Sequence, residues 1–511
     1  MFQVRCIIAP NTYRDSVFLM KLSSQAGAES GAEQVSAMMG TPRNKELLVM
    51  SGLATADMEK AGPEDLVIAV KGEADTLDAA EQAVKRLLTG TAPQKSSVAG
   101  ASVPRDLEEA VKADPALNLV LISTAGDYAR YEAAKAVNAG LDVMLYSDNI
   151  ALGDEIALKE QATRKGVLVM GPDCGTAIID GVPLAFANQV SRGPVGIVGA
   201  SGTGLQEVIC LLDRLGVGIS QAYGTGGRDL KDDVGGLTAV AALRRLERDP
   251  TTRIIVLLGK PPGKKTRAML VELLPRLGKP VFVHYLGASD HAQEEAAGLH
   301  SAKDLTDLAV LAARQVKPDL NTEAVIRVPA MPVRARPGYL RGLFGGGTLC
   351  QEAAELAAPL LQGEKCSNLD VAGFVPIAAD ATSKGHCFWD FGDDAFTVGR
   401  PHPMMAPELK MERLIRELGD PEVSVVLMDM VIGYGAHQDQ TGALLRALET
   451  AGARQARTAQ DLVIVVSVCG ADADSPSRKE EVARLEEAGI IVCGSNAQAA
   501  IFAAKATRGG E

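Results

Sequence analysis

A glycine-rich turn in the middle of the chain has the residue types that bind a phosphate or a carboxylate. Gly199-Ala-Ser-Gly-Thr-Gly204 follows the apolar run Val195–Val198 and precedes a helix expected over Leu205–Leu215. Glycines let the backbone approach a ligand, and the free N–H groups of a helix start favour an oxyanion. The candidate anion-binding residues are Ser201, Gly202, Thr203 and Gly204. The alternative is a tight turn in which a hydroxyl side chain only caps the helix.

A related turn occurs later in the chain and indicates an internal repeat. The segment VGIVGASGTGLQEV, Val195–Val208, matches LRGLFGGGTLCQEA, Leu340–Ala353, with a constant shift of 145 residues. Further echoes follow in the same order, so we predict two copies of one domain. The anion-binding candidates of the second copy are Gly346, Gly347 and Thr348. If the two copies face each other, both helix starts converge on one anion.

The second turn of each copy adds cationic and titratable candidates. These are Gly226, Gly227 and Arg228 in the first copy, and Gly399, Arg400 and His402 in the second. A guanidinium can fork onto a carboxylate or phosphate, and a histidine between two prolines can act as an acid, a base or a phosphate contact. We therefore take Arg228, Arg400 and His402 as catalytic candidates. The alternative for His402 is a turn histidine that only packs.

A third set of polar residues follows strands of the preceding α/β region. Gly171-Pro-Asp-Cys-Gly175 comes directly after a strand, and open α/β sheets bind ligands at the carboxyl ends of their strands. The candidate cofactor contacts are Ser123, Asp173 and Cys174. Cys174 can be a nucleophile, or a buried structural thiol because no histidine is near it in sequence.

The histidines do not form a metal-binding pattern. No HxH or HExxH spacing occurs among the six of them, so no metal site is predicted. Neither a GxSxG elbow nor a GxxxxGK[ST] loop is present. Asp393 and Asp394 can hold Mg²⁺ or cap the turn that follows them, which leaves Mg²⁺ open as a cofactor.

Composition narrows the class of protein. The net charge is −12 and no long basic run exists, which argues against nucleic acid as a partner. No apolar run reaches about 18 residues, so no membrane span is expected. The eight cysteines include no CxxC pair, which predicts reduced thiols in a cytoplasmic protein.

Strands that alternate with helices must position the candidate residues. Aromatic residues make up only 4% of the 511 residues and small residues carry the packing, which suits parallel sheets closely covered by helices. We predict an α/β fold with a Rossmann-like domain over residues 104–193 and two flavodoxin-like, doubly wound domains over 194–317 and 338–508. Residues 1–95 either supply further strands of the Rossmann sheet or form a separate small domain.

These motifs, in this order, resemble a known family. GPDCG, VGIVGASGTG and GTGGRDL resemble the α subunit of succinyl-CoA synthetase over residues 106–316. GGGT, DFGDD and LGDPEVSVVLMD in the second copy resemble the carboxy-terminal domain of that enzyme's β subunit. With SAMMGTP at 36–42 and AFTVGRPHPM at 395–404, the whole chain resembles the FdrA family. The resemblance implies a CoA-binding-type Rossmann domain followed by two ligase-type domains.

The resemblance also implies an enzyme subunit that works with other subunits on a small anion. FdrA-family members are described as acyl-CoA synthetases, and the family is associated with the oxamate carbamoyltransferase of ureide and purine nitrogen catabolism. The first role implies CoA and a phosphorylated histidine, for which His291 is the nearest candidate. The second implies carbamoyl phosphate or phosphate at the paired helix starts, where arginine and backbone donors stabilise developing charge.

Three functions follow from the resemblance and the site residues together. Because no region of the 511 residues is left for an ATP-grasp domain, a carbamoyltransferase subunit is the main prediction. An acyl-CoA synthetase subunit that uses CoA and a phosphohistidine is the second. The third is a non-catalytic scaffold that binds an anion and organises partner enzymes.

Overall fold

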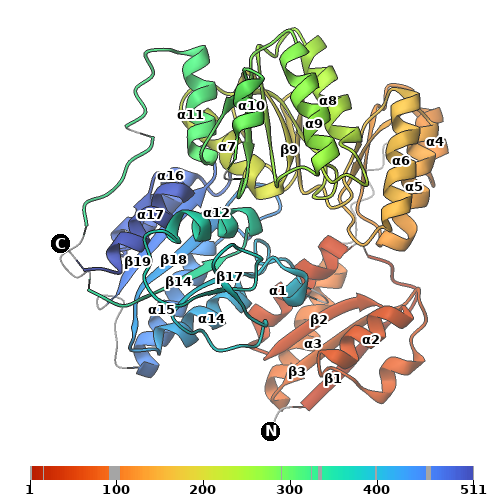
Figure 1. The fold of residues 1–511 in the computed structure, drawn as a ribbon. Helices are drawn as coiled ribbons and strands as arrows, with labels where there is room; N and C mark the ends of the chain where they lie inside the picture. Colours follow the sequence, from red (N-terminus) through yellow and green to blue (C-terminus); the bar gives the residue numbers. More distant parts are fainter. Residues whose placement is uncertain are drawn as a thin grey trace. The chain divides into compact units, whose positions relative to one another are not determined.

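The computed structural model describes residues 3–14, 16–90, 104–288, 290–323, 325–331, 336–397, 400–455 and 462–509. The chain divides into two compact units. The first contains residues 1–103 with a short stretch at 397–401, and the second contains residues 104–396 and 402–511. Figure 1 shows both units coloured along the sequence.

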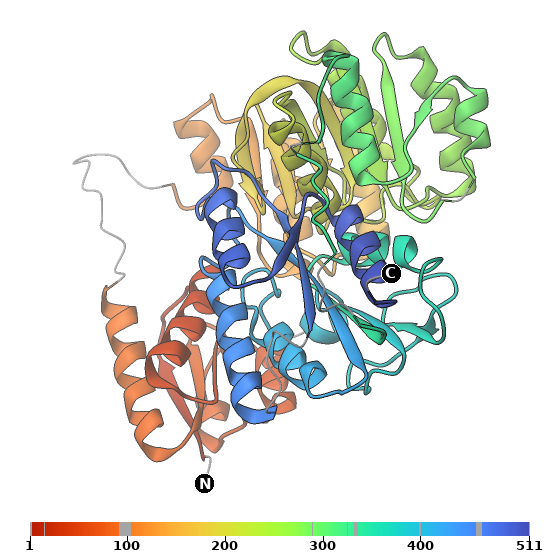
Figure 2. The same cartoon turned by 90° about the vertical axis from the view of Figure 1, so that its left-hand side faces the viewer.

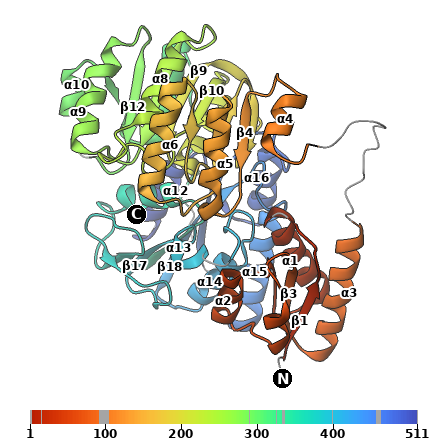
Figure 3. The same cartoon turned by 90° about the vertical axis from the view of Figure 1, so that its right-hand side faces the viewer.

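The first unit is a small antiparallel sheet with helices on both faces. Its strands β1 (Gln3–Ala9), β2 (Gln34–Met39) and β3 (Leu66–Gly72) pair in the order β1-β3-β2. Its helices are α1 (Ser16–Ser30), α2 (Pro42–Met50), the 3-10 helix η1 (Ala56–Lys60) and α3 (Ala74–Gly90). α1 and α3 pack on one face, and α2 and η1 cover the other (Figure 3). Because β1 and β2 both pair with β3, this region has a sheet of its own.

The second unit begins with a small parallel sheet. Its strands β4 (Leu119–Ile122), β5 (Asp142–Leu145) and β6 (Val169–Met170) pair in that order, and its helices are α4 (Leu107–Ala113), α5 (Gly126–Asn138) and α6 (Leu152–Lys165). Ala129, Ala133 and Ala136 recur on one face of α5 and bury it against the sheet. The βαβ units confirm the Rossmann-like fold predicted for this region.

The next domain has a seven-stranded sheet in the order β13-β12-β11-β9-β10-β7-β8. Its parallel strands are β9 (Arg192–Ala200), β10 (Ile219–Gly224), β11 (Ile254–Gly259), β12 (Val281–Tyr285) and β13 (His300–Ser301). Its helices are α7 (Gly202–Arg214), α8 (Leu237–Arg248), α9 (Lys264–Leu273), the 3-10 helix η2 (Leu274–Arg276), α10 (Ala292–Ala296) and α11 (Leu305–Val316). Counted from β9, the parallel strands have the flavodoxin-like order 2-1-3-4-5.

An antiparallel hairpin extends this sheet at one edge. β7 (Thr176–Ile179) pairs with β8 (Val182–Ala185) and meets β10 at the pair Ile178 and Ala222. The sheet therefore recruits strands from residue 176 onward, before the boundary expected at residue 194.

The third domain of this unit repeats the same topology. Its parallel strands are β14 (Tyr339–Phe344), β17 (His386–Asp390), β18 (Val423–Val431), β19 (Val463–Cys469) and β20 (Ile491–Cys493), again in the order 2-1-3-4-5. Its helices are α12 (Gly347–Ala357), α13 (Asp394–Thr397), α14 (Glu408–Leu418), α15 (Gln440–Gln455), α16 (Arg478–Glu487) and α17 (Asn496–Ala506). β15 (Lys365–Ser367) and β16 (Val375–Pro376) are inserted between α12 and β17 at the sheet edge. The predicted internal repeat and the two doubly wound domains are confirmed.

The two copies pack through equivalent helices. α7 and α11 of the first copy face α12 and α17 of the second, and their buried side chains belong to one continuous apolar core. Figure 1 shows α7 and α12 next to each other between the two sheets, and Figure 2 shows α17, in dark blue, beside α12. This arrangement brings the starts of the two equivalent helices together.

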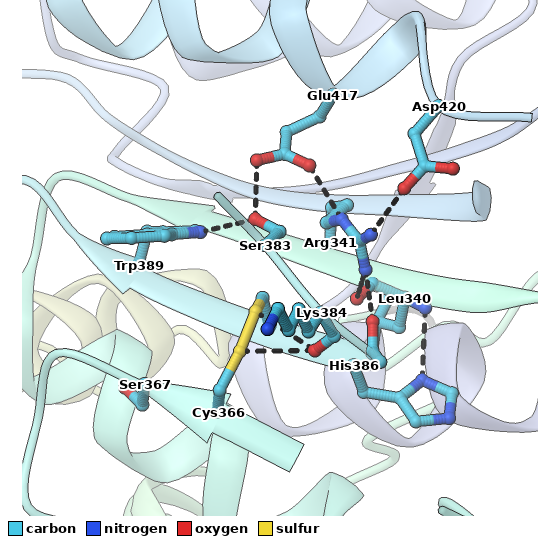
Figure 4. Close-up of a disulfide and its surroundings, with 12 residues drawn as sticks. Leu340, Arg341, Cys366, Ser367, Ser383, Lys384, His386, Trp389, Glu417 and Asp420 are labelled. Atoms are coloured by element: carbon cyan, nitrogen blue, oxygen red, sulfur yellow. Dashed lines mark hydrogen bonds and ion pairs between the residues drawn. A yellow bond between two sulfur atoms is a disulfide. The ribbon is translucent and has the colours of Figure 1, made fainter. Parts of the chain in front are cut away.

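A buried polar cluster holds the inserted edge of the second copy (Figure 4). Arg341 contacts Glu417 at 2.6 Å and Asp420 at 2.8 Å, and Glu417 also accepts a hydrogen bond from Ser383. Next to this cluster, Cys366 and Cys387 lie directly opposite each other on β15 and β17 and form a disulfide. The prediction of reduced thiols is therefore wrong for this pair, and the other six cysteines are free.

Candidate functional site

The starts of α7 and α12 touch each other. Ser201 Oγ lies 2.5 Å from Thr348 Oγ1, so one hydroxyl donates to the other. A methyl group on Gly346 would lie 2.8 Å from Thr203 Cγ2, and one on Gly204 would lie 3.1 Å from Thr348 Cγ2. Glycine at these two positions lets the first turns approach, so two positive helix ends share one small region.

The start of α7 combines capping with free donors. Ser201 is its N-cap, because Ser201 Oγ accepts the N–H of Gly204 at 3.1 Å. The N–H groups of Gly202 and Thr203 lie in the first turn, where a helix provides no backbone acceptor. Ser201 therefore performs the capping role that was the alternative.

The start of α12 is partly occupied by the protein's own carboxylate. Asp429, near the end of β18, accepts the N–H of Gly345 at 2.7 Å and that of Gly346 at 2.8 Å. Lys410 Nζ lies 3.1 Å from the same carboxylate. The prediction that Gly346 offers its N–H to an external anion is therefore wrong, because Asp429 already takes it.

A second carboxylate approaches the same helix start. Asp390 ends β17, and a methyl group on Gly347 would lie 2.6 Å from Asp390 Oδ2. Burial, supported by the charges of Asp429 and Asp393, raises the pKa of Asp390 to about 7. Lys260, which follows β11 of the first copy, opposes this rise. The site is thus asymmetric: carboxylates accompany α12, whereas α7 carries only hydroxyls and backbone donors.

Arg228 is engaged by a buried ion network and is not free to bind a substrate. Its Nε lies 2.8 Å from Glu155 Oε2, and its Nη2 donates to the carbonyl of Ile150. Lys159 lies 2.9 Å from Glu155 and 2.8 Å from Asp229, and Asp229 accepts the N–H groups of Thr238 and Ala239 at the start of α8. The catalytic role predicted for Arg228 is corrected to a structural one, since its partners are Glu155 on α6 and the backbone of Ile150 just before that helix.

The glycines beside Arg228 serve the fold in different ways. Gly226 has a φ of +84°, and a methyl group there would lie 2.4 Å from the carbonyl oxygen of Pro172. It lets this turn pass close to the turn after β6. Gly227 is exposed, and nothing lies within 4 Å of a methyl group built on it. The structure places neither glycine in the contact between the starts of α7 and α12.

The second turn of the second copy is only partly described. Gly399 lies outside the described residues. Arg400 is exposed and belongs to the 397–401 stretch of the first unit. His402 lies beside the β17 end, since a methyl group on Gly392 would be 3.0 Å from its Nε2 and 3.1 Å from Asp390 Oδ1. Burial lowers the pKa of His402 to about 4, so it is neutral near pH 7 and its Nδ1 accepts the Met404 N–H.

The carboxyl edge of the small parallel sheet is acidic. Burial raises the pKa of Asp173 to about 6, and the nearby charge of Asp148 adds to the rise. Burial raises the pKa of the Cys174 thiol to about 12, so the structural thiol is the better of the two interpretations. Ser123 is exposed at the end of β4. The charge of Arg228, which is itself paired with Glu155, opposes the rise in the pKa of Asp173.

The sequence reasoning missed the carboxylates of the second copy. Asp429 aligns with Leu258 of the first copy, so the repeat alone did not mark it as functional. Asp390 was passed over within DFGDD. Asp393, which was weighed as a Mg²⁺ ligand, accepts the Ala395 N–H and caps a turn. A useful signal would have been that a charged residue in one copy replaces an apolar one in the other.

Within the described ranges, no group of three or more His, Cys, Asp or Glu residues is arranged to hold a metal ion. Residues 1–104 contain one cysteine, Cys6, and no histidine, and burial raises the pKa of the Cys6 thiol. None of the described helices is both long and apolar enough to cross a membrane.

Three known families match parts of the chain. The family described as CoA-ligase matches residues 343–506, and the CoA binding domain matches residues 190–283. The family described as AllF, heavy metal-associated domain, matches residues 1–104. With Cys6 as its one cysteine and no histidine, that first region cannot supply two or more cysteine or histidine ligands to a metal ion. The two CoA-related matches fall on the two copies that form the paired helix starts.

Relatives agree with these matches. The α subunit of succinate–CoA ligase (ADP-forming) from Methanothermobacter thermautotrophicus is 29% identical over 209 residues, 40% of this chain and 69% of that protein. A solved acetyl-coenzyme A synthetase from Candidatus Korarchaeum cryptofilum covers 81% of this chain and 87% of its own, at 16% identity and a TM-score of 0.35, too low to carry an argument. The protein named Uncharacterized protein YahF of Escherichia coli strain K12 is 40% identical over 509 residues, 98% of each chain. The chain therefore belongs to the family of YahF.

Proposed function

We propose that this chain is a subunit of an acyl-CoA synthetase-like enzyme that binds an acyl phosphate, or the phosphate released from it, at the starts of α7 and α12. The observation that carries the proposal is the 2.5 Å contact between Ser201 and Thr348. Two adjoining helix starts supply backbone donors and two favourable dipoles to one oxyanion. The CoA-ligase match includes α12 and the CoA binding match includes α7, which supports this assignment.

The charges near the helix starts favour a phosphoryl group. Lys260 is exposed at the end of β11, and its charge acts on both Asp390 and Glu355 of the second copy. Lys410 already neutralises Asp429. A bound phosphate would therefore meet hydroxyls, backbone N–H groups and the Lys260 cation, with Asp390 as the one carboxyl group to be accommodated.

His291 is the candidate phosphoryl carrier of the proposed enzyme. A methyl group on Gly287 would lie 2.6 Å from Glu355 Oε1, so the loop after β12 packs against α12. His291 caps α10, and its buried Nδ1 has no hydrogen-bond partner among the described residues. An imidazole nitrogen without a partner can accept a phosphoryl group. In that transfer the P–O bond to the acyl oxygen breaks, an N–P bond forms and the carboxylate leaves.

Ligand-induced stabilisation of the purified chain tests the proposal. Phosphate, acetyl phosphate, carbamoyl phosphate and CoA are added separately, and the unfolding temperature is measured for each. A ligand at 100 times its Kd adds about 2.7 kcal/mol to the free energy of unfolding. We expect stabilisation by the phosphates and by CoA, with the phosphate effect lost in Thr348→Val. If none of the phosphates raises the unfolding temperature of the wild-type chain or of its complex with partner subunits, the proposal is wrong.

Carbamoyl transfer without CoA is a second candidate. The observation that favours it is the pairing of Asp148 with Asp173 at the edge where open α/β sheets bind a cofactor. Two carboxyl groups there would repel the pyrophosphate of CoA. Carbamoyl phosphate is an acyl phosphate and needs only the helix starts, and the FdrA-type motifs of the sequence agree with this role. Stabilisation by carbamoyl phosphate together with no response to CoA would favour this candidate over the first.

A further inference from the structure

Asp390 is held rigidly beside the first turn of α12. Its backbone N–H donates to Asn368 Oδ1 at 2.8 Å, and its carbonyl accepts from Asn368 Nδ2 at 2.9 Å. The residue is 5% exposed. These two bonds hold the Asp390 backbone at the end of β17, beside the helix start.

The two oxygens of the Asp390 carboxyl group have different surroundings. Oδ1 accepts the Gly392 N–H at 2.8 Å. Oδ2 lies beside Gly347, and no donor among the described residues is bonded to it. In this mostly buried residue, a carboxyl oxygen without a donor is costly when it is charged, whereas a protonated oxygen there can donate to a ligand. The free oxygen thus lies at the same helix start that receives the phosphate in the proposed function.

The groups that face Asp390 separate its role from that of Asp429. Asp429 on β18 has two N–H donors and Lys410, so it is stabilised as a carboxylate. Asp390 faces Asp429, Asp393, the buried thiol of Cys350 and the neutral imidazole of His402, with Lys260 as the opposing cation. Burial is the largest influence and raises the pKa of Asp390 to about 7. Both protonation states are therefore accessible near neutral pH.

We infer that Asp390 is the proton donor to the leaving phosphate at the paired helix starts, a role that rests on the proposed function. A nucleophile attacks the acyl carbon, the bond between that carbon and the bridging oxygen breaks, and the Asp390 proton passes to the departing phosphate oxygen. The proton released by the nucleophile then restores the carboxylic acid. The overall reaction converts an acyl phosphate and a thiol or amine into a thioester or amide and hydrogen phosphate.

Proton uptake on anion binding tests this role without an enzymatic assay. Sulfate is the probe, because its charge stays constant between about pH 5.5 and about pH 8.5 while that of Asp390 does not. Calorimetric titrations of the whole chain at about pH 8, in buffers with different ionisation enthalpies, give the number of protons taken up for each sulfate bound. The affinity is measured across the same pH range for the wild type, Asp390→Asn and the control Asp370→Asn, which changes an exposed aspartate of the same copy.

The wild type should take up about one proton per sulfate, and its Kd should rise about tenfold per pH unit above the pKa of Asp390. Asp390→Asn keeps a neutral donor, so it should bind sulfate without uptake and with a flat pH profile, and Asp370→Asn should behave as wild type. If the wild type binds sulfate without taking up a proton, the inference about Asp390 is wrong and the proposed anion site still stands. This result needs only the wild type, so it holds even if Asp390→Asn does not fold. Failure of the wild type to bind sulfate or phosphate removes the proposed function and this role together.

Discussion

Glu207 and Glu352 occupy equivalent positions in the two copies, and each caps the last helix of the other copy. Glu207 on α7 accepts the N–H of Asn496 at the start of α17 at 3.0 Å. Glu352 on α12 accepts the N–H of Leu305 at the start of α11 at 2.8 Å, and the Asn496 side chain at 2.7 Å. This reciprocal capping sets how α7 and α12 lie against each other, so it also sets the contact between Ser201 and Thr348.

The reciprocal capping makes stability depend on pH through Glu352. Burial raises the pKa of Glu352 from an ordinary 4.5 to about 8. The native state therefore holds this proton more tightly than the unfolded state, and stability falls as the pH rises from about 4.5 to about 8. Glutamine does not titrate, so Glu352→Gln lacks this pH-dependent loss. Between pH 5 and pH 8 the free energy of unfolding of the variant should therefore rise by on the order of 1–3 kcal/mol relative to that of the wild type.

Urea unfolding of both proteins at several pH values measures this difference. Glu352→Ala is the matched variant, because it leaves the Leu305 N–H without an acceptor and should be destabilised at every pH. A difference between Glu352→Gln and wild type that stays constant from pH 5 to pH 8 would show that the Glu352 carboxyl does not titrate in this window.

Removal of the hydroxyls at the helix starts should weaken anion binding. Ser201→Ala loses the N-cap of α7 and should cost about 1 kcal/mol of stability, in addition to its effect on phosphate. The Thr348 side chain does not cap a helix, so Thr348→Val should cost little stability. It should reduce phosphate affinity by about tenfold to a hundredfold. Thr348→Ser retains the hydroxyl and is the control. Equal phosphate affinity of Thr348→Val and Thr348→Ser, measured by titration calorimetry, would exclude the hydroxyl from the site.

Close approach of the copies should depend on glycine at position 346. A methyl group there would lie 2.8 Å from Thr203 Cγ2, so Gly346→Ala must move the two first turns apart. We expect a loss of about 1–3 kcal/mol in the free energy of unfolding and weaker phosphate binding. Gly227→Ala is the matched control, since nothing lies within 4 Å of its added methyl group. Thermal unfolding and phosphate titration of both variants measure the two effects, and identical behaviour would contradict the packing described.

The network around Lys159 should matter for folding and not for ligand binding. Lys159→Met leaves the Asp229 carboxylate buried without a cation and Glu155 with Arg228 alone, and should cost about 3–5 kcal/mol. Arg228→Ala removes a half-exposed partner of Glu155 and should cost less than about 1 kcal/mol, with phosphate affinity unchanged. Denaturant unfolding gives both values. A large loss of phosphate affinity in Arg228→Ala would restore the catalytic role that its sequence context suggested.

The fold was predictable because its signals are local or repeated. The helix predicted over Leu205–Leu215 corresponds to α7, Gly202–Arg214, and the shift of 145 residues placed the two doubly wound domains. The hairpin of β7 and β8 was not predicted, because short edge strands carry little periodicity. The disulfide of Cys366 and Cys387 was missed because its cysteines are 21 residues apart on an inserted edge.

Only the part of the site that is formed by the repeated turns could be predicted from the sequence. The equivalent turns of the two related copies, with Ser201 in one and Thr348 in the other, had to meet if the copies faced each other. Long-range pairings followed no such rule. Arg228 is bound by Glu155, which lies 73 residues earlier in another domain, and the Gly346 N–H is taken by Asp429, which lies 83 residues later. Contacts of this kind depend on tertiary packing, so residue type and spacing alone assigned both residues to a ligand.

A crystal structure of the chain grown with phosphate tests the central claim most directly. The account predicts one phosphate within about 3.2 Å of backbone N–H groups at both helix starts, from Gly202 or Thr203 on α7 and from Gly347 or Thr348 on α12. Phosphate bound only at the carboxyl edge of β4, β5 and β6, near Ser123 and Asp173, would contradict it. So would a phosphate that contacts one helix start without the other.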